Sequence, residues 1–322
     1  MLGAGGATRQ AITVGGRTGT PLWWATRAAV VGDEGRCGGG GDYNIFPQQE
    51  QVAGAVKLAK LLVEKGARVN AVGADEDGHE STPLWWAVLG ALNQRGALQL
   101  PTLLVEHGAN VNAVGSAANG QFPTATPLWI AVFKYTMVEE NWEAGFDMVK
   151  LLVEKDARVN YVAAAEGRSA SETYKCAPLW LAAKAVYDGR ARAVEMATLL
   201  VHKGADANKV GEWGREDEST PLRRAAEAVR DGKAGGPELA RLLISAGARL
   251  ADDEKDAFQG FIDKMPLSPL SLTLLARTST SLTVSWPGGL AGRGLHSSTF
   301  RLNVSALCGI VGVAFRGCLG DV

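Results

Sequence analysis

The chain has 322 residues, and 46% of them are hydrophobic, a fraction typical of a globular protein that buries a core. Its 33 basic and 34 acidic residues give a net charge of −1, so no global field attracts it to nucleic acid or to a membrane. The length allows two ordinary domains, or an elongated array with a smaller part attached.

Cysteine usage and apolar runs bear on the compartment. The four cysteines lie far apart, with no histidine at ligand spacing, which favours free thiols over disulfides or zinc: Cys37, Cys176, Cys308 and Cys318. Residues 1–16 lack the apolar core of a secretory signal. The longest apolar run near the end, Val304–Phe315, is shorter than the roughly 20 residues that span a bilayer. We therefore expect a cytoplasmic protein that does not bind membranes.

Two blocks recur five times in the same order. The first block reads TPLWWA at 20–25, TPLWWA at 82–87, TPLWIA at 126–131, APLWLA at 177–182 and TPLRRA at 220–225. The second reads KLLVEKGARVN at 60–70, TLLVEHGANVN at 102–112, KLLVEKDARVN at 150–160, TLLVHKGADAN at 198–208 and RLLISAGARL at 241–250. The chain is therefore built from five internal repeats.

Each block predicts a helix. A threonine at the start can cap free backbone N–H groups, and the proline after it sits where its missing N–H costs nothing. The second block ends in a glycine, which suits the left-handed residue that follows a helix, at Gly66, Gly108, Gly204 and Gly247. Asp156 replaces this glycine in the third repeat and should weaken that cap. One helix pair cannot cover its own apolar face, so neighbouring pairs must stack.

These residues resemble the ankyrin repeat, whose T-P-L-H-x-A opening and later V-x-L-L-x-x-G-A-x-x-N element match across residues 14–250. The resemblance implies a mainly α fold: a helix-pair solenoid with hairpin-like finger loops beside a concave face. We assign residues 1–265 to this array. Its last segment, Asp252–Met265, has the amphipathic pattern of an end helix that caps the fifth repeat.

The chain departs from the family at the histidine of the opening motif. Tryptophan takes that place at Trp23, Trp85, Trp129 and Trp180, and Arg223 takes it in the fifth repeat. An indole can donate but cannot accept a hydrogen bond, so we expect packing area to replace hydrogen bonding there. Core packing is the favoured interpretation of these tryptophans, and a tryptophan-lined ligand groove is the alternative.

The repeats are also long. Successive openings are 62, 44, 51 and 43 residues apart, against about 33 in the family. We expect enlarged fingers and helices lengthened by up to a turn or two. In the first repeat the helices are separated by a segment with four consecutive glycines, Gly38–Gly41, which favours a flexible linker. A phosphate-binding loop would need a following Gly-Lys-Ser/Thr.

The pattern changes at Pro266. Residues 266–286 resemble the first two strands of a fibronectin type III domain, with Trp286 as the core tryptophan of the second strand. Only 36 residues follow Trp286, too few for a sandwich of about 100 residues. We expect a truncated β segment and a largely disordered tail at 287–322. A truncated domain and a misjoined gene model both account for this ending.

No catalytic constellation is visible. The four histidines lie in connectors, at helix ends and in the tail, away from any plausible nucleophile: His79, His107, His202 and His296. The acidic clusters at 75–80 and 216–218 lack the ligand spacing of a calcium loop, so solvated charge or the footprint of a basic partner is favoured over a metal site. We expect no enzyme activity, no cofactor and no metal.

The resemblance implies a binding function. The chain is expected to be a monomeric scaffold or adaptor that binds another protein of acidic or mixed charge. The alternative is a regulatory arm of an enzyme complex whose catalytic subunit is another chain. On the concave face, the candidate partner-binding residues are Arg27, Leu89, Phe133, Lys134, Lys184 and Glu227. In the fingers they are Asp77, His79, Phe122, Tyr174 and Trp213. Packing against lengthened neighbours is the competing interpretation of Leu89 and Phe133.

Overall fold

The computed structural model describes residues 9–31, 49–93, 98–117, 122–137, 142–166, 173–214, 216–250, 273–277, 281–286 and 298–303. The chain divides into two compact parts, residues 1–263 and 264–322. The Gly38–Gly41 segment and the expected end helix at 252–265 lie outside the described residues. None of the described helices is long and apolar enough to cross a bilayer.

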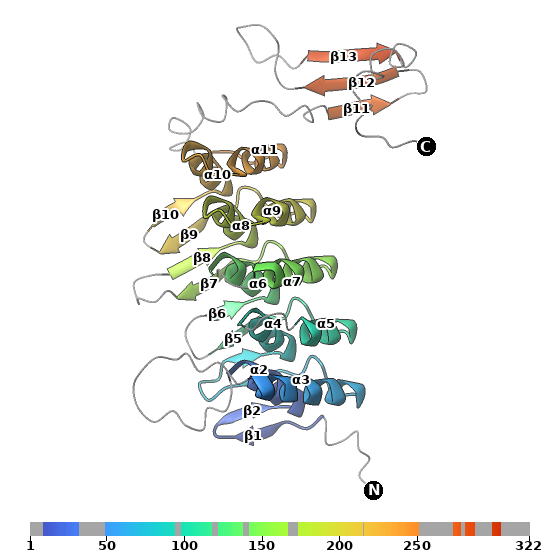
Figure 1. Cartoon of the computed structure of the whole chain (residues 1–322), viewed down its shortest axis with the longest axis vertical. Helices are drawn as coiled ribbons and strands as arrows, with labels where there is room; N and C mark the ends of the chain where they lie inside the picture. The colour runs from blue at the N-terminus through green and yellow to red at the C-terminus, as the bar shows by residue number, and fades with distance from the viewer. Residues whose placement is uncertain are drawn as a thin grey trace. The chain divides into compact units, whose positions relative to one another are not determined.

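The first part is a stack of five helix pairs, one for each sequence repeat (Figure 1). The first helices of repeats 1 to 5 are α2 (Pro21–Val31), α4 (Pro83–Asn93), α6 (Pro127–Met137), α8 (Pro178–Tyr187) and α10 (Pro221–Arg230). The second helices are α3 (Gln49–Glu64), α5 (Gln99–Glu106), α7 (Trp142–Glu154), α9 (Ala193–His202) and α11 (Gly236–Ser245). Each first helix contacts the next one along the stack, and so do the second helices α3 with α5, α7 with α9 and α9 with α11, as the solenoid interpretation requires.

The helix ends follow the sequence prediction. In four repeats the opening threonine Oγ1 accepts the backbone N–H three residues later, at 3.4, 3.3, 3.3 and 3.1 Å in repeats 1, 2, 3 and 5. Ala177 has no such cap in repeat 4. The four predicted glycines have φ angles of 79°, 81°, 83° and 84°, and Asp156 adopts the same conformation at 59°.

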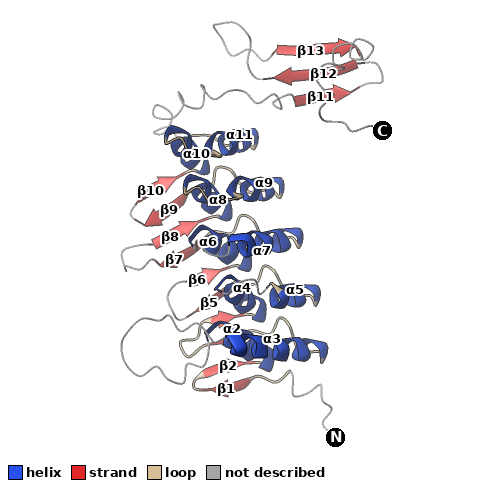
Figure 2. Cartoon of the chain, in the orientation of Figure 1, coloured by secondary structure: helices blue, strands red, loops and turns tan. Residues whose placement is uncertain are grey.

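A β-hairpin precedes the first helix of every repeat, so four of the five hairpins are connectors between repeats, as expected of enlarged fingers. The pairs are β1 (Ile12–Val14) with β2 (Arg17–Gly19), β3 (Gly73–Ala74) with β4 (Glu80–Ser81), β5 (Gly115–Ala117) with β6 (Phe122–Ala125), β7 (Ala163–Glu166) with β8 (Thr173–Cys176), and β9 (Gly211–Gly214) with β10 (Glu216–Ser219). Neighbouring hairpins also pair with each other, which forms two antiparallel sheets, β1 to β4 and β5 to β10, along one side of the helices (Figure 2).

The tryptophan of each opening motif belongs to the core. Trp23, Trp85, Trp129 and Trp180 have no exposed surface, so the ligand-groove interpretation is wrong. The expectation that packing alone serves these side chains is also wrong. Each indole N–H donates to the last residue of the next hairpin: Ser81 Oγ at 3.1 Å, Ala125 O at 3.1 Å, Cys176 O at 2.7 Å and Ser219 O at 2.9 Å. An indole needs only an acceptor, and the following repeat supplies it.

Glycine at the hairpin base makes room for three of these rings, those of Trp23, Trp85 and Trp180. A Cβ on Gly73 would lie 2.4 Å from the ring of Trp23, and one on Gly115 would lie 2.6 Å from the ring of Trp85. Both distances are far inside van der Waals contact, so the tryptophan and the glycine of the next hairpin form one packing unit.

Asparagines form a second ladder between repeats. The asparagine that ends each second block donates its Nδ2–H to the carbonyl of the next repeat's left-handed residue, at 2.9, 3.2, 2.9 and 3.1 Å for Asn70, Asn112, Asn160 and Asn208. Its Oδ1 accepts the backbone N–H of the residue two positions after that left-handed residue. The donors are Asn110, Arg158, Asp206 and Arg249, at 2.7, 2.6, 2.7 and 2.8 Å. In repeat 1 the carbonyl of the left-handed residue Gly66 accepts from the Nε–H of Arg9 instead of from an asparagine, at 3.2 Å.

The second part holds three described strands, β11 (Thr273–Arg277), β12 (Ser281–Trp286) and β13 (Ser298–Asn303), paired antiparallel in this order. The first two occur where the sequence predicts strands. β13 lies within the range expected to be disordered, so that expectation does not describe residues 298–303. Three strands are fewer than the seven of an immunoglobulin-like sandwich, and the fibronectin type III resemblance remains a prediction.

Candidate functional site

The candidate concave-face residues occupy the middle and end of the first helices, and they differ in exposure. Leu89 in α4 is 4% exposed, and Phe133 in α6 is 7% exposed. Both side chains are buried, as the interpretation that they pack against neighbouring elements requires. Arg27 in α2 is 9% exposed, and its Cζ lies 5.5 Å from the ring centroid of Trp86 and 5.9 Å from that of Trp23. These three side chains offer little surface to a partner.

Three candidate residues from different elements meet in one place. Phe133 of α6, Tyr174 of β8 and Trp213 of β9 form the aromatic cluster. The ring centroids of Tyr174 and Trp213 are 4.3 Å apart, and that of Phe133 lies 6.1 and 6.2 Å from them. The pairing of β8 with β9 places Tyr174 directly opposite Trp213. Tyr174 is 9% exposed and Trp213 is half-buried, so Trp213 is the exposed edge of the cluster.

Core tryptophans support this cluster from beneath. Trp129 stacks on Phe133 at 4.8 Å with ring planes 16° apart, and Trp180 stacks on Trp213 at 5.8 Å and 25°. Sequence reasoning did not assign either tryptophan to the candidate site. The spacing of Trp129 and Phe133, four residues apart on one helix, is the signal that could have connected them.

A cation borders the cluster. Lys184 Nζ lies 5.0 Å from the ring centroid of Trp213, within cation–π range. The same ammonium group donates to both carboxylate oxygens of Asp188, at 2.9 and 3.0 Å. Lys134, which occupies α6 beside Phe133 in the chain, is half-buried, and burial lowers the pKa of its ammonium group below the ordinary value of 10.5.

The remaining candidates lie elsewhere. Glu227 of α10 binds Arg223 at 3.2 Å and Arg224 at 3.0 Å, which makes it part of an ion-pair group in repeat 5. Phe122 begins β6, and its side chain is outside the described part of the structure. The candidate residues therefore do not form one continuous surface; the structure brings together those of repeats 3 and 4.

Asp77 and His79 belong to the turn of the β3–β4 hairpin. Asp75 Oδ1 accepts the backbone N–H groups of Asp77 at 3.1 Å and His79 at 2.8 Å, and it lies 3.2 Å from His79 Nδ1. Within the described residues these three side chains bring ligand-type atoms within 4.8 Å of one another. The Asp75 oxygen already closes the turn, so the group has a structural role in this hairpin.

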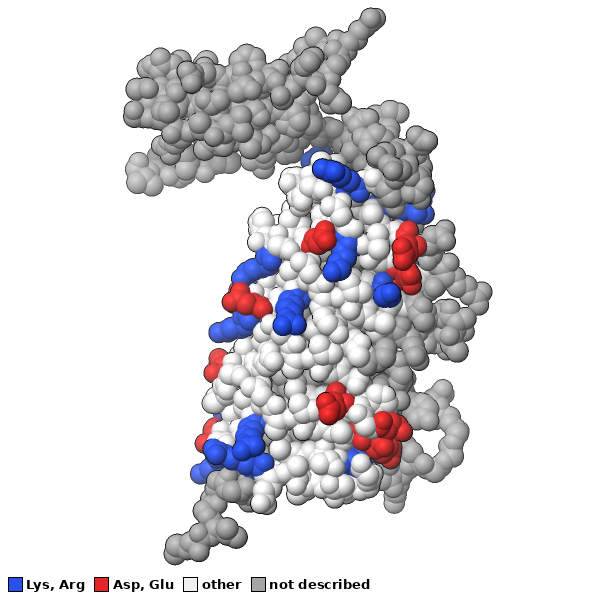
Figure 3. Space-filling model, turned by 180° about the vertical axis from the view of Figure 1, so that it is seen from behind, with Lys and Arg blue, Asp and Glu red and all other residues white. Residues whose placement is uncertain are grey.

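Charge on the outer side of the stack is mixed. Figure 3, seen from behind, shows Lys and Arg interspersed with Asp and Glu, with one denser basic group toward the repeat 1 end. Over the described residues this face carries no continuous basic stripe of the kind that tracks a nucleic acid backbone.

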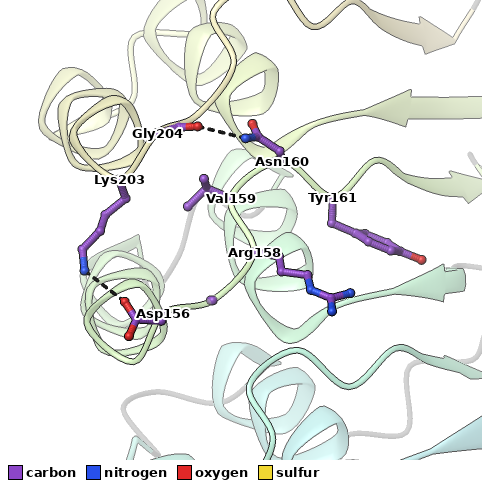
Figure 4. A pocket seen from close by; sticks show the side chains of 8 residues that line it. Asp156, Arg158, Val159, Asn160, Tyr161, Lys203 and Gly204 are labelled. Atoms are coloured by element: carbon purple, nitrogen blue, oxygen red, sulfur yellow. Dashed lines mark hydrogen bonds and ion pairs between the residues drawn. The ribbon is translucent and has the colours of Figure 1, made fainter.

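An open hollow of about 500 Å³ lies between repeats 3 and 4, at the turns that follow their second helices. Figure 4 shows that Asn160 spans it to Gly204 and that Lys203 reaches Asp156 at 3.4 Å, while Arg158 and Tyr161 point away from that ion pair. Its polar groups serve the asparagine ladder, so we do not place the functional site there.

Comparison with known proteins finds a family match for one of the repeats. Residues 79–116, which contain β4, α4 and α5, match the model of the ankyrin repeat family. A solved structure of an ankyrin repeat domain from Acinetobacter baumannii AYE is similar at 21% sequence identity, with a TM-score of 0.41, over 71% of this chain and 98% of that one. No curated protein sequence matches the chain. Ankyrin repeats in general mediate protein–protein interactions, and residues 79–116 of this chain match such a repeat.

Proposed function

We propose that this chain binds another protein through the aromatic cluster and Lys184, on the side of repeats 3 and 4 where the first helices meet the hairpins. The observation that carries the proposal is the environment of Trp213. Its half-buried ring rests on Tyr174 and Trp180, with the Lys184 ammonium 5.0 Å from the ring centroid. A tryptophan held rigidly by buried neighbours loses little entropy on binding, which is typical of an interface anchor.

We infer that all five helix pairs are ankyrin-type repeats. The matched segment owes its structure to a threonine cap, a buried tryptophan, a left-handed glycine and an asparagine that binds the next repeat. Three or four of these features recur in repeats 1, 3 and 4. This recurrence supports a binding scaffold rather than a catalyst.

The charges near Trp213 favour an acidic or mixed partner surface. Lys184 lies beside the ring, Lys175 is exposed on β8, and Lys134 follows Phe133 on α6. A partner carboxylate near Trp213 could share the Lys184 ammonium with Asp188. We propose a protein partner in the cytoplasm, because the near-zero net charge and the scattered cysteines both favour that setting over nucleic acid or an oxidising compartment.

Affinity capture with the full chain tests this function. Trp213→Ser and Lys184→Glu change the proposed surface, and Lys60→Glu and Lys150→Glu change exposed lysines on the second helices as a control. We expect the wild type and the control to retain the same protein, and the surface variant to lose it while its circular dichroism spectrum stays unchanged. Equal recovery with all three baits would reject this surface.

A further inference from the structure

Repeat 1 exposes positions that the other repeats bury. Leu58 of α3 is 49% exposed. The residues at the same place in the later second helices are 3%, 0%, 0% and 0% exposed: Leu100, Met148, Met196 and Leu239. The first helix shows the same contrast, because Ala28 is exposed whereas Ala185 and Ala228 are 0% exposed.

The contrast locates an open face of the stack. Repeats 2 to 5 each follow another repeat in the structure, and among the described residues the Leu58 position of repeat 1 is the exposed one. An outer face of a solenoid has to be polar if it is to stay in water. Here that face carries Leu58 at 49% and Leu61 at 51% exposure, with the half-buried Trp24 of α2 in the same repeat. Two leucines half in water on one helix indicate a surface that another structure covers.

The exposed residues of α3 have the spacing of a coiled-coil seam. Gly54, Leu58 and Leu61 of α3, with Lys65 directly after its end, are separated by four, three and four residues, and all are exposed. In an antiparallel pair of identical helices, Leu58 of each copy would meet Leu61 of the other. Lys65 would lie over Gly54, where a missing side chain leaves room for its aliphatic stem and the ammonium reaches water.

The charges beside this seam are self-complementary. Lys57 and Glu64 are seven residues apart, both are exposed, and both flank the seam on the same edge. In the antiparallel arrangement Lys57 of one copy faces Glu64 of the other, twice by symmetry. The lysine is particular to repeat 1, because the same place holds Gln99, Asp147, Glu195 and Glu238 in the later repeats.

We propose that two copies of this chain associate through the open face of repeat 1, with their α3 helices packed antiparallel about Leu58 and Leu61. This differs from the monomer expected from the sequence, and it does not depend on the function proposed above. Lys60 is exposed and lies on the far side of α3 from Leu58, so it is the natural charge control.

Sedimentation equilibrium of the full chain over a range of concentrations tests the proposal. The wild type is expected to form dimers with a dissociation constant on the order of micromolar, typical of a small interface. Leu58→Glu should weaken the dimer at least about tenfold, because it places a charge in the seam. Lys57→Glu and Glu64→Lys should each weaken it about threefold to tenfold through like-charge contacts, and the double swap K57E/E64K should restore it. Lys60→Glu should leave the dissociation constant unchanged.

Four results would overturn the proposal. The first is a wild type that stays monomeric at all concentrations, and the second is a dimer that Leu58→Glu does not weaken. The third is a double swap no better than either single swap. The fourth is association lost on Ile244→Glu, since Ile244 is 42% exposed in repeat 5, far along the chain from α3, and its loss would indicate head-to-tail stacking.

Discussion

The indole N–H of Trp129 donates to the carbonyl oxygen of Cys176 at 2.7 Å, across the boundary between repeats 3 and 4. Both residues are 0% exposed, so neither group can turn to water instead. The sulfur of Cys176 is buried as well, and burial raises the pKa of that thiol, which keeps it neutral beside the indole.

Trp129→Phe should therefore lower the free energy of unfolding by about 1–3 kcal/mol, because the Cys176 carbonyl loses its donor in a dry site. Urea denaturation followed by circular dichroism measures this. Trp24→Phe is the matched control, since the Trp24 ring is half-buried and its indole N–H lies 3.4 Å from Ile12 O in an exposed contact. Equal losses in both variants would show that the hydrogen bond between repeats contributes little.

Asp156 offers a stabilising substitution. It holds φ at 59°, where the other four repeats have glycine. Asp156→Gly should raise the free energy of unfolding by about 0.5–1 kcal/mol, because glycine enters the left-handed region without a Cβ penalty. The lost ion pair with Lys203 is long and exposed, so its removal should cost less than this gain. Lys203→Met removes the ion pair alone and so measures its contribution to stability. A Tm for Asp156→Gly that is no higher than that of the wild type would contradict the prediction.

The hydrogen bonds of the asparagine ladder should make a measurable contribution to the free energy of unfolding. Asn160 makes two hydrogen bonds to repeat 4, to Gly204 O at 2.9 Å and from Asp206 N at 2.7 Å. Asn160→Ala should lower the free energy of unfolding by about 1–2 kcal/mol. Asn110→Ala removes a bond within one repeat, to Asn112 N, and should cost less. Hydrogen exchange should show faster opening of repeats 4 and 5 in Asn160→Ala, and uniform exchange would contradict a role in stacking.

The burial of Lys134 should make the stability of the folded chain depend on pH. Burial lowers the pKa of its ammonium group from 10.5, so the folded state binds this proton less tightly than the unfolded state does. Stability of the wild type should therefore rise with pH from the lowered pKa up to 10.5. Lys134→Met should be more stable than wild type at neutral pH, and its advantage should shrink across that window. An advantage that does not change with pH would contradict desolvation as the cause.

The sequence predicts the local parts of the fold well, because their causes are local. The threonine caps and the left-handed glycines follow from residues within one turn of the helix end. The acceptor of each tryptophan was missed, because it lies 39 to 58 residues further along the chain. The meeting of Phe133, Tyr174 and Trp213 depends on the register of β8 against β9, which no single repeat specifies.

The exposure of Leu58 could not be read from the sequence either. Its repeat pattern matches that of Leu100, and only the position of repeat 1 in the stack makes the difference between 49% and 3% exposure.

If a partner protein covers Trp213, it should protect that ring from solvent. Oxidative footprinting of side chains, on the full chain alone and with its captured partner, measures this protection. We expect oxidation of Trp213 to fall several-fold in the complex, while Trp24, half-buried at the repeat 1 end, is modified at the same rate in both samples. Unchanged oxidation of Trp213 in a saturated complex would show that the partner binds another surface.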